Sequence, residues 1–364
     1  MAHTKLLNSR TKIDKAGKYL VSPNDDRDRL EEALDVLNNW RSFHRFPLNT
    51  ITVDLRLKVK RVQPEAPSPV RRLKRARSVV NKLSKESMRL TQMQDIGGCR
   101  AVLPDIRSVY EVAHLYASGR SQHKLVHVDD YISKSKDSGY RSLHLIFEFK
   151  SSAYPQYNKL LIEVQLRTEA QHAWATAVET VGAMSGQALK SSQGEKDWLD
   201  FFKLASVALE SSEYAILPRP LSSSLGSIAR SLAKLRRELH VDKKLTAYRE
   251  ALRATEKTVA KKAAYYLLVF LPEQPQLQIF SYSRHSTDQA FADYEKFERI
   301  LPLYPSRRQL PLFPELENYS GAQAVLVGVE SFKDLRESYP NYYLDTKVFL
   351  ERLDAFIRRY RRAP

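Results

Sequence analysis

The sequence predicts an α+β fold, in which helices flank a mixed β-sheet and a helical connector leads to a small C-terminal α/β domain. Two observations support this prediction. Short apolar or alternating runs typical of strands come between runs with helical spacing in the first 210 residues, and the same kind of pattern returns after residue 262. We therefore expect a domain at residues 1–210, a connector at 211–262 and a second domain at 263–364.

The first domain is predicted to begin with a helix over residues 27–40, where apolar residues recur at helical spacing. A proline-rich break at residues 62–69 separates it from a basic helix that we expect over residues 71–85. Strand patterns then follow at residues 99–103, 124–132, 142–149 and 160–166, with helices at 106–117 and 168–181.

The connector is charged and helical, and Leu232, Leu235 and Leu239 form an apolar seam along it. Ordinary packing of this seam against the rest of the chain is the simplest interpretation. In the second domain we expect strands at residues 265–271, 277–282 and 322–329 and helices at 287–300 and 346–360.

Composition narrows the class of protein. The formal net charge is +17, which favours a polyanionic partner such as a nucleotide or RNA, although a surplus spread over the surface for solubility is the alternative. A single cysteine excludes an internal disulfide, and no apolar run is long enough to cross a bilayer. The sequence therefore indicates a cytoplasmic protein without a membrane partner.

The basic segment carries the first candidate site. Lys74, Ser78, Lys82 and Lys85 are three or four residues apart, so on a helix they share one face. A triphosphate would relieve the repulsion between these lysines, and Arg72 or Arg75 would be free to stack on a base. A solvated face that binds nothing is the alternative.

Two carboxylates follow at positions suited to a metal ion. Asp95 precedes a Gly-Gly turn at the start of a strand, and Glu163 alternates with Gln165 on the polar face of another strand. Magnesium takes one or two protein carboxylates and completes its coordination shell with substrate phosphates. The alternative is a structural salt bridge between Glu163 and Arg100.

A basic loop at residues 131–144 offers a third element. Tyr140 could stack on a base while Lys134 and Lys136 meet phosphates, and His144 follows four residues after the tyrosine. A hairpin turn with a tyrosine at the edge of the core is the alternative.

Together these elements resemble the RelA/SpoT-type alarmone synthetase domain. The motifs that carry the resemblance are DIGGCR from Asp95, GYRSLH from Gly139 and EVQLRT from Glu163, followed by the pair Trp174 and Ala175, and they cover roughly residues 25 to 210.

The resemblance implies a role for each site residue. Asp95 would bind magnesium, and Glu163 would either assist in this or accept the proton of a 3′-hydroxyl. Tyr140 would stack on the acceptor base with help from His144 and Gln165, with Lys134 and Lys136 beside it. The residues expected to bind ATP are Arg72, Lys74, Arg75, Ser78, Lys82, Lys85 and Arg100.

The reaction implied by the family is the transfer of a diphosphate from ATP to a ribose 3′-hydroxyl. The leading hypothesis for the acceptor is the 3′ end of tRNA, whose modification would inhibit translation. GDP or GTP, or an adenine nucleotide, is the alternative, with (p)ppGpp or (p)ppApp as product. A catalytically silent RNA-binding module is a third possibility, against which the intact Asp95, Tyr140 and Glu163 count.

The C-terminal region resembles the fused antitoxin region of the CapRel group of toxic small alarmone synthetases. The motif is a Tyr-x-x-Tyr pair, Tyr339 and Tyr342. The resemblance implies that these tyrosines occlude the ATP site until a phage protein relieves the block, as part of antiphage defence. Two tyrosines packed under a loop are the alternative.

Overall fold

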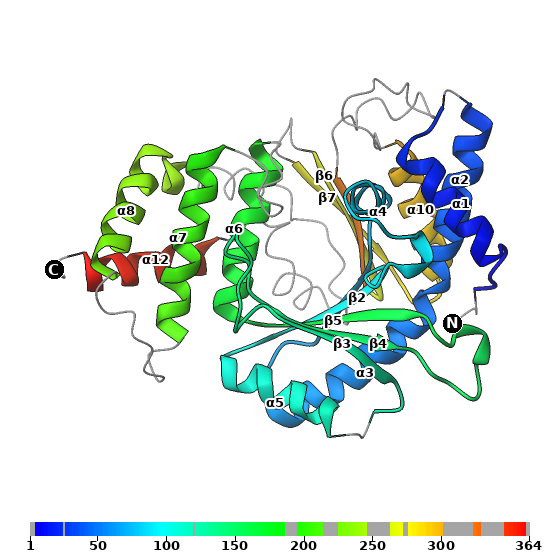
Figure 1. The fold of residues 1–364 in the computed structure, drawn as a ribbon, viewed down its shortest axis with the longest axis horizontal. Coiled ribbons are helices and arrows are strands. Elements are labelled where there is room, and N and C mark those ends of the chain that lie inside the picture. Colours follow the sequence, from blue (N-terminus) through cyan, green and yellow to red (C-terminus); the bar gives the residue numbers. More distant parts are fainter. Residues whose placement is uncertain are drawn as a thin grey trace.

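The computed structural model describes residues 4–24, 26–118, 121–185, 195–213, 225–245, 263–271, 276–300, 323–328 and 346–361. An eight-stranded mixed sheet with the order β3-β4-β5-β2-β1-β8-β6-β7 runs through the molecule (Figure 1). Adjacent strands pair antiparallel except β2 and β5, which are parallel. The predicted α+β class is confirmed.

The strands have the following bounds: β1 Val70–Leu73, β2 Gly97–Leu103, β3 Lys124–Asp130, β4 Leu143–Glu148, β5 Leu161–Thr168, β6 Tyr265–Leu271, β7 Gln276–Tyr282 and β8 Gln323–Gly328. The α-helices are α1 Arg10–Val21, α2 Arg27–Phe43, α3 Arg45–Val62, α4 Ala76–Leu83, α5 Ile106–Ala117, α6 Glu169–Ser185, α7 Lys196–Glu213, α8 Leu225–Glu238, α10 Thr287–Ile300 and α12 Lys347–Tyr360. Short 3₁₀ turns lie at Leu90–Gln92 and Pro155–Tyr157.

Alternation along β2 and β5 gives the centre of the sheet two different faces. Cys99 and Ala101 of β2 and Ile162 and Val164 of β5 point into the main hydrophobic core, which α3 and α5 cover (Figure 1). The opposite face of the same two strands carries polar side chains, because successive side chains of a strand point to opposite sides.

A second hydrophobic core joins α6, α7, α8 and α12. Leu232 of α8 is fully buried there, and Leu235 and Leu239 pack against it, as the predicted seam requires. Phe349 of α12 lies against the rings of Phe201 and Phe202 of α7. Helix α12 therefore packs on the helices that follow strand β5 (Figure 1).

The C-terminal strands extend the sheet of the first domain. β8 pairs with β1, with Arg71 opposite Gly328 and Arg72 opposite Val327, and β6 and β7 continue the sheet beyond it. A side chain at residue 328 would place its Cβ 2.9 Å from Cζ of Arg71, so glycine allows this close approach. The boundaries at residues 210 and 262 stay predictions, but the two regions share one sheet.

The predicted basic helix over residues 71–85 is wrong at both ends. Val70–Leu73 form strand β1, and helix α4 spans only Ala76–Leu83. The strand forms because β2 and β8 supply backbone partners on both sides, which local helix spacing does not reveal. Consequently Lys74 precedes the helix and Lys85 follows it.

No helix in the described part of the chain is both long and apolar enough to cross a membrane.

Candidate active site

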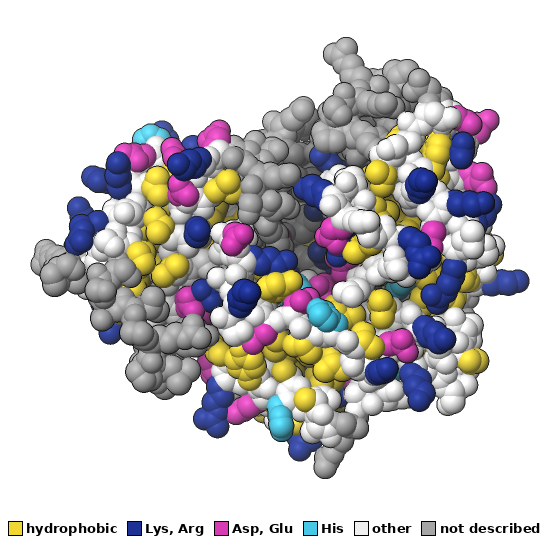
Figure 2. Space-filling view, in the orientation of Figure 1, with side chains coloured by type: hydrophobic (Ala, Val, Ile, Leu, Met, Phe, Trp, Pro, Cys, Tyr) yellow, Lys and Arg dark blue, Asp and Glu magenta, His cyan; other side chains and the backbone are white. Residues whose placement is uncertain are grey.

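The polar face of the central strands brings together the motifs that the sequence singled out. Glu163 of β5 lies opposite Gly98 of β2, and Gln165 lies between Arg100 of β2 and His144 of β4. In the space-filling view, acidic and basic side chains gather around the hollow between α4 and α6 (Figure 2).

One side of the site is built on an acid and two lysines. Nζ of Lys74 lies 2.6 Å from Oδ2 of Asp95, and Nζ of Lys82 lies 3.2 Å from Oδ1 of the same carboxylate. Lys74 is fixed because its backbone N–H donates to the carbonyl of Ile96, one residue after Asp95. Burial raises the pKa of Asp95, but the two lysines outweigh burial and hold that pKa below its ordinary value.

The other predicted ATP residues lie around this cluster. Ser78 is half-buried on α4, one turn before Lys82, and Arg75 is the N-cap residue of α4. Arg72 pairs with Gly98 and therefore shares the face of Glu163, as does Arg100. Lys85 is exposed beyond the end of α4. Their role in ATP binding stays a prediction.

Glu163 is buried, and both of its carboxylate oxygens accept hydrogen bonds. Oε1 lies 2.8 Å from Nδ1 of His144, and Oε2 lies 2.7 Å from Nε2 of Gln165. Burial raises the pKa of Glu163, but the bond and charge of His144 outweigh burial, and the pKa falls to about 2. The group is therefore a carboxylate at neutral pH.

The predicted acceptor residues meet at the same place. The hydroxyl of Tyr140 lies 2.8 Å from Nε2 of His144, and the tyrosine side chain is 5% exposed. Nζ of Lys136 lies 4.2 Å from the ring centroid of Tyr131 and 5.6 Å from that of Tyr140. Lys134 is exposed on the same loop. Burial lowers the pKa of His144, but Tyr140 and Glu163 outweigh burial and raise the pKa.

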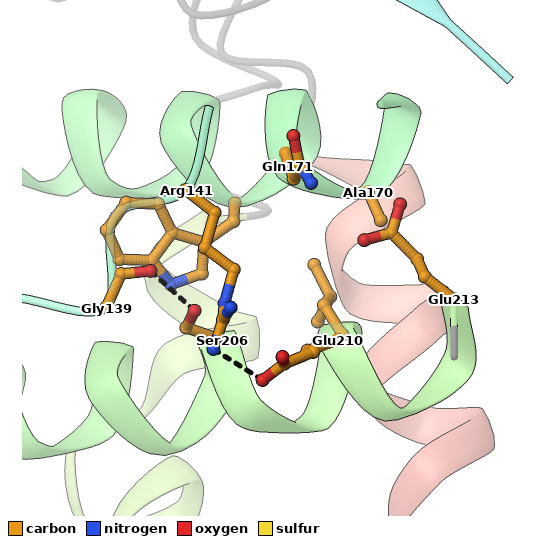
Figure 3. Close-up of a pocket in the computed structure, with 9 residues that line it drawn as sticks. Gly139, Arg141, Ala170, Gln171, Ser206, Glu210 and Glu213 are labelled. Carbon is orange, nitrogen blue, oxygen red and sulfur yellow. Dashed lines mark hydrogen bonds and ion pairs between the residues drawn. The ribbon is translucent and has the colours of Figure 1, made fainter. Parts of the chain in front are cut away.

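Helix α7 contacts the loop that carries Tyr140 and holds it in place. Sequence reasoning missed this contact. Arg141 forms an ion pair with Glu210, and the hydroxyl of Ser206 donates to the carbonyl of Gly139 (Figure 3). These residues, with Gln171 and Glu213, line a small cavity between α6, α7 and the loop. Residues 206–213 carry no local sequence signal for this contact, because the loop lies more than sixty residues earlier.

Gly139 is required for this contact. Its φ is +87°, a conformation that side chains rarely adopt, and an added Cβ would lie 2.8 Å from Cβ of Ser206. The glycine of the GYRSLH motif therefore lets the loop turn and approach α7.

Sequence reasoning also missed a role for Arg167. It is 1% exposed on the polar face of β5, and its NH2 lies 2.6 Å from the Tyr140 hydroxyl and 3.1 Å from Oε1 of Gln165. The alternation of Glu163, Gln165 and Arg167 along β5 was the signal that could have placed it in the site.

The two carboxylates suit a magnesium ion that also binds substrate phosphates. The charges of Asp95 and Glu163 act on one another, and the missing side chain of Gly98 leaves space beside Oε2 of Glu163, where a Cβ would lie 3.6 Å away. In the described part of the chain, no group of three or more His, Cys, Asp or Glu residues could hold a metal by itself. A two-carboxylate site completed by phosphates fits the donor preference of magnesium.

The predicted regulatory pair, Tyr339 and Tyr342, lies outside the described residues.

Comparison with known proteins identifies the family. A family model described as a region found in RelA / SpoT proteins matches residues 71–181. The GTP pyrophosphokinase YjbM of Bacillus subtilis (strain 168) is 32% identical over 152 residues, which cover 38% of this chain and 70% of YjbM. The GTP pyrophosphokinase YwaC of the same organism is 34% identical over 114 residues, which cover 29% of this chain and only 52% of YwaC.

A solved structure, that of the small alarmone synthetase 2 from Bacillus subtilis, aligns at 24% identity with a TM-score of 0.41, over 49% of this chain and 95% of that one. The RelA/SpoT match contains all the site residues from Arg72 to Arg167, and the match to YjbM spans more than two thirds of that protein. The chain therefore belongs to the RelA/SpoT family of pyrophosphokinases.

Proposed function

We propose that this chain is a magnesium-dependent pyrophosphokinase that transfers the β- and γ-phosphates of ATP, as one diphosphate group, to a ribose 3′-hydroxyl. One observation carries the proposal: two lysines converge on Asp95, and this cluster is close enough to the buried carboxylate of Glu163 for their charges to interact. The names of YjbM and YwaC, both GTP pyrophosphokinases, support transfer of diphosphate.

The lysines provide the phosphate side of the reaction. Lys74 and Lys82 both lie within hydrogen-bond distance of the carboxylate of Asp95. They are therefore close enough together to bind one phosphate group in place of that carboxylate. Placed against the β- and γ-phosphates, they would neutralise charge as the bond between the β-phosphorus and the α–β bridging oxygen breaks and AMP leaves.

Glu163 provides the base. The 3′-oxygen forms a bond to the β-phosphorus, and its proton passes to the carboxylate of Glu163, which is ionised and held by His144 and Gln165. The pKa of about 2 makes Glu163 a weak base, so its contribution is orientation of the hydroxyl as much as proton removal.

Magnesium would be held by Asp95 and Glu163 together with the phosphates of ATP. When bound, the ion supplies charge neutralisation at the transferred group.

The acceptor is the finer part of the proposal. The net charge of +17 supports the 3′ end of tRNA, because a polyanion gains from a basic surface. The names of the relatives support GDP or GTP instead. We propose tRNA as the acceptor, with inhibition of translation as the result, and a free nucleotide as the competing outcome of the test.

The test follows the label of ATP that carries ³²P in the γ-phosphate. Wild type and the Glu163→Gln variant are incubated with magnesium and with tRNA, GDP, GTP or ATP as acceptor. The Glu111→Gln variant, which breaks only an exposed ion pair with Arg107 on α5, serves as a matched control. Label on tRNA that Glu163→Gln abolishes supports the full proposal, whereas label on a nucleotide supports only the chemistry. Absence of label from every acceptor, both with wild type and with the Tyr339→Ala/Tyr342→Ala variant described below, contradicts diphosphate transfer.

We also propose that the C-terminal region inhibits the enzyme and that a phage protein releases it. The support is the Tyr-x-x-Tyr motif and the contact of α12 with α6 and α7. Truncation after residue 262 is a poor test, because it removes β8, the pairing partner of β1. The Tyr339→Ala/Tyr342→Ala double variant changes no residue of the described strands. We expect it to label acceptors faster than wild type, and an unchanged rate would contradict inhibition by these tyrosines.

A further inference from the structure

Five side chains of the candidate active site form a closed ring of hydrogen bonds. The ring runs from Glu163 to His144 (2.8 Å), to Tyr140 (2.8 Å), to Arg167 (2.6 Å), to Gln165 (3.1 Å) and back to Glu163 (2.7 Å). The five side chains come from three segments of the chain, which are the loop before β4, strand β4 and strand β5.

The chemistry of the guanidinium fixes the direction of the two bonds that leave Arg167. An arginine nitrogen has no lone pair to offer, so NH2 of Arg167 donates one proton to the hydroxyl of Tyr140 and the other to Oε1 of Gln165. With a neutral imidazole, the hydroxyl then donates its own proton to Nε2 of His144, and with an imidazolium Nε2–H donates to the hydroxyl instead. In either state Nδ1–H donates to Oε1 of Glu163. The amide Nε2 of Gln165 donates to Oε2 of Glu163.

Two arms therefore leave one nitrogen and end on the two oxygens of one carboxylate. The first passes through Tyr140 and His144, and the second passes through Gln165. Hydrogen bonds in such a chain polarise one another, and the effect is larger where water is excluded. All five side chains are buried or half-buried, so the conditions for this coupling are met.

Arg167 is otherwise an unusual residue to bury. Its hydrogen-bond partners within the described residues are uncharged, namely Ser142, Tyr140 and Gln165, and its NH1 has no partner there. A buried guanidinium with an orphaned nitrogen is costly for stability. A role in the site accounts for its burial better than packing does.

We propose that Arg167 is a positioning residue, which orients the catalytic carboxylate of Glu163 and the acceptor-stacking ring of Tyr140 at once through the two arms that leave its NH2. The inference rests on the proposed function of Glu163 and on the stacking role that the family resemblance implies for Tyr140. It explains why the orientations of these two side chains are fixed, and it implies that a change at Tyr140 also affects the orientation of Glu163.

The first readout does not depend on activity. The proton on Nδ1 of a buried histidine that donates to a carboxylate resonates far downfield in the ¹H NMR spectrum, and its loss in His144→Gln assigns the resonance. At one fixed pH, we expect this resonance to move upfield in Arg167→Met and in Tyr140→Phe, which removes only the hydroxyl of the first arm. Arg41→Met is the matched control, since Arg41 is also buried and hydrogen-bonded to Lys74, Asn38 and Tyr294 but lies outside the ring.

The second readout is a mutant cycle on kcat. A displaced catalytic group commonly costs about 100-fold, so we expect Arg167→Met to lower kcat by about that factor and Arg167→Lys, which keeps donors, by less. In a Tyr140→Phe/Gln165→Leu background, where both arms are already cut, Arg167→Met should cost less than about 3-fold. A residue with a purely structural role would cost the same factor in both backgrounds.

The outcomes separate cleanly. A downfield resonance that is absent from wild type, or that stays in place in Arg167→Met, would overturn the inference. If Arg167→Met does not fold, Arg167→Lys, which keeps the buried charge, takes its place in the NMR comparison. If neither wild type nor the Tyr339→Ala/Tyr342→Ala variant transfers diphosphate, the proposed function fails, while the NMR result still shows whether Arg167 orders the ring.

Discussion

Neutralising Asp95 should lower the free energy of unfolding in the absence of ATP, and it should also strengthen the binding of metal-free ATP. In the Asp95→Asn variant, Lys74 and Lys82 lose the carboxylate that holds them at 2.6 and 3.2 Å. Hydrogen bonds to charged groups contribute about 1.5 to 3 kcal/mol each. Because both lysine side chains keep some exposure, 16% and 25%, and the asparagine oxygen still accepts one bond, we expect a net loss of about 2 kcal/mol in the free energy of unfolding.

The two freed lysines then favour a polyphosphate. ATP in EDTA no longer competes with a carboxylate for Lys74 and Lys82, so we expect its Kd to fall by about 10-fold in the variant, which corresponds to about 1.4 kcal/mol. Diphosphate transfer with magnesium should be lost, because one of the two metal-binding carboxylates is missing.

Thermal unfolding with and without ATP in EDTA, followed by calorimetric titration, measures both effects on the same samples. Glu111→Gln on the far side of α5 serves as the matched control. If ATP binds the asparagine variant more weakly than wild type, Lys74 and Lys82 are not phosphate ligands, and the assignment of the phosphate side is refuted.

Three further predictions concern the support of the site. Gly139→Ala should lower the free energy of unfolding by about 2 kcal/mol and raise the acceptor KM, because φ is +87° and the new Cβ meets Ser206; an unchanged Tm would contradict this. Glu210→Ala should raise the acceptor KM about 10-fold with little change in the ATP KM, since it leaves Arg141 without its carboxylate beside Tyr140; equal effects on both KM values would argue against it. Burial raises the pKa of Glu213 to about 7, so ionisation of this group lowers the free energy of unfolding as pH rises from about 4.5 to about 7. The Glu213→Gln variant should therefore have a free energy of unfolding up to about 3 kcal/mol higher than wild type at pH 8, but nearly the same at pH 4.5. Denaturant unfolding at both pH values tests the sign of this difference.

Local patterns predicted the regular elements well where one segment determines its own structure. The helix over residues 106–117 and the strand over residues 265–271 were confirmed at the same bounds, because apolar spacing and β-branched or aromatic content are local signals. The motifs also indicated which side chains would meet, and Asp95 and Glu163 do lie near one another.

Long-range pairing explains what the sequence could not predict. β1 is a strand because β2 and β8 border it, and β8 lies about 250 residues further along the chain. The support of the loop by Ser206 and Glu210 is also non-local. Arg167 differs from these, because its face was predictable from alternation but its donor pattern depends on three other side chains.

The charges of the site indicate how substrate binding changes it. Lys74 and Lys82 carry two positive charges, and Asp95 and Glu163 carry two negative ones, so this four-residue group is neutral as it stands. Both carboxylates are engaged by protein donors, Asp95 by the lysines and Glu163 by His144 and Gln165. If ATP binds as proposed, it draws the lysines from Asp95 toward the phosphates.

That exchange exposes the oxygens of Asp95 at the moment when the phosphates arrive. A metal ion with high affinity for the free protein would have to displace both lysines without any compensating anion. A metal that enters with the nucleotide meets a carboxylate already released, at a site whose added negative charge attracts it. The arrangement thus favours entry of magnesium together with ATP, and it keeps Glu163, which is bound to the hydrogen-bond ring and not to the lysines, oriented throughout the exchange.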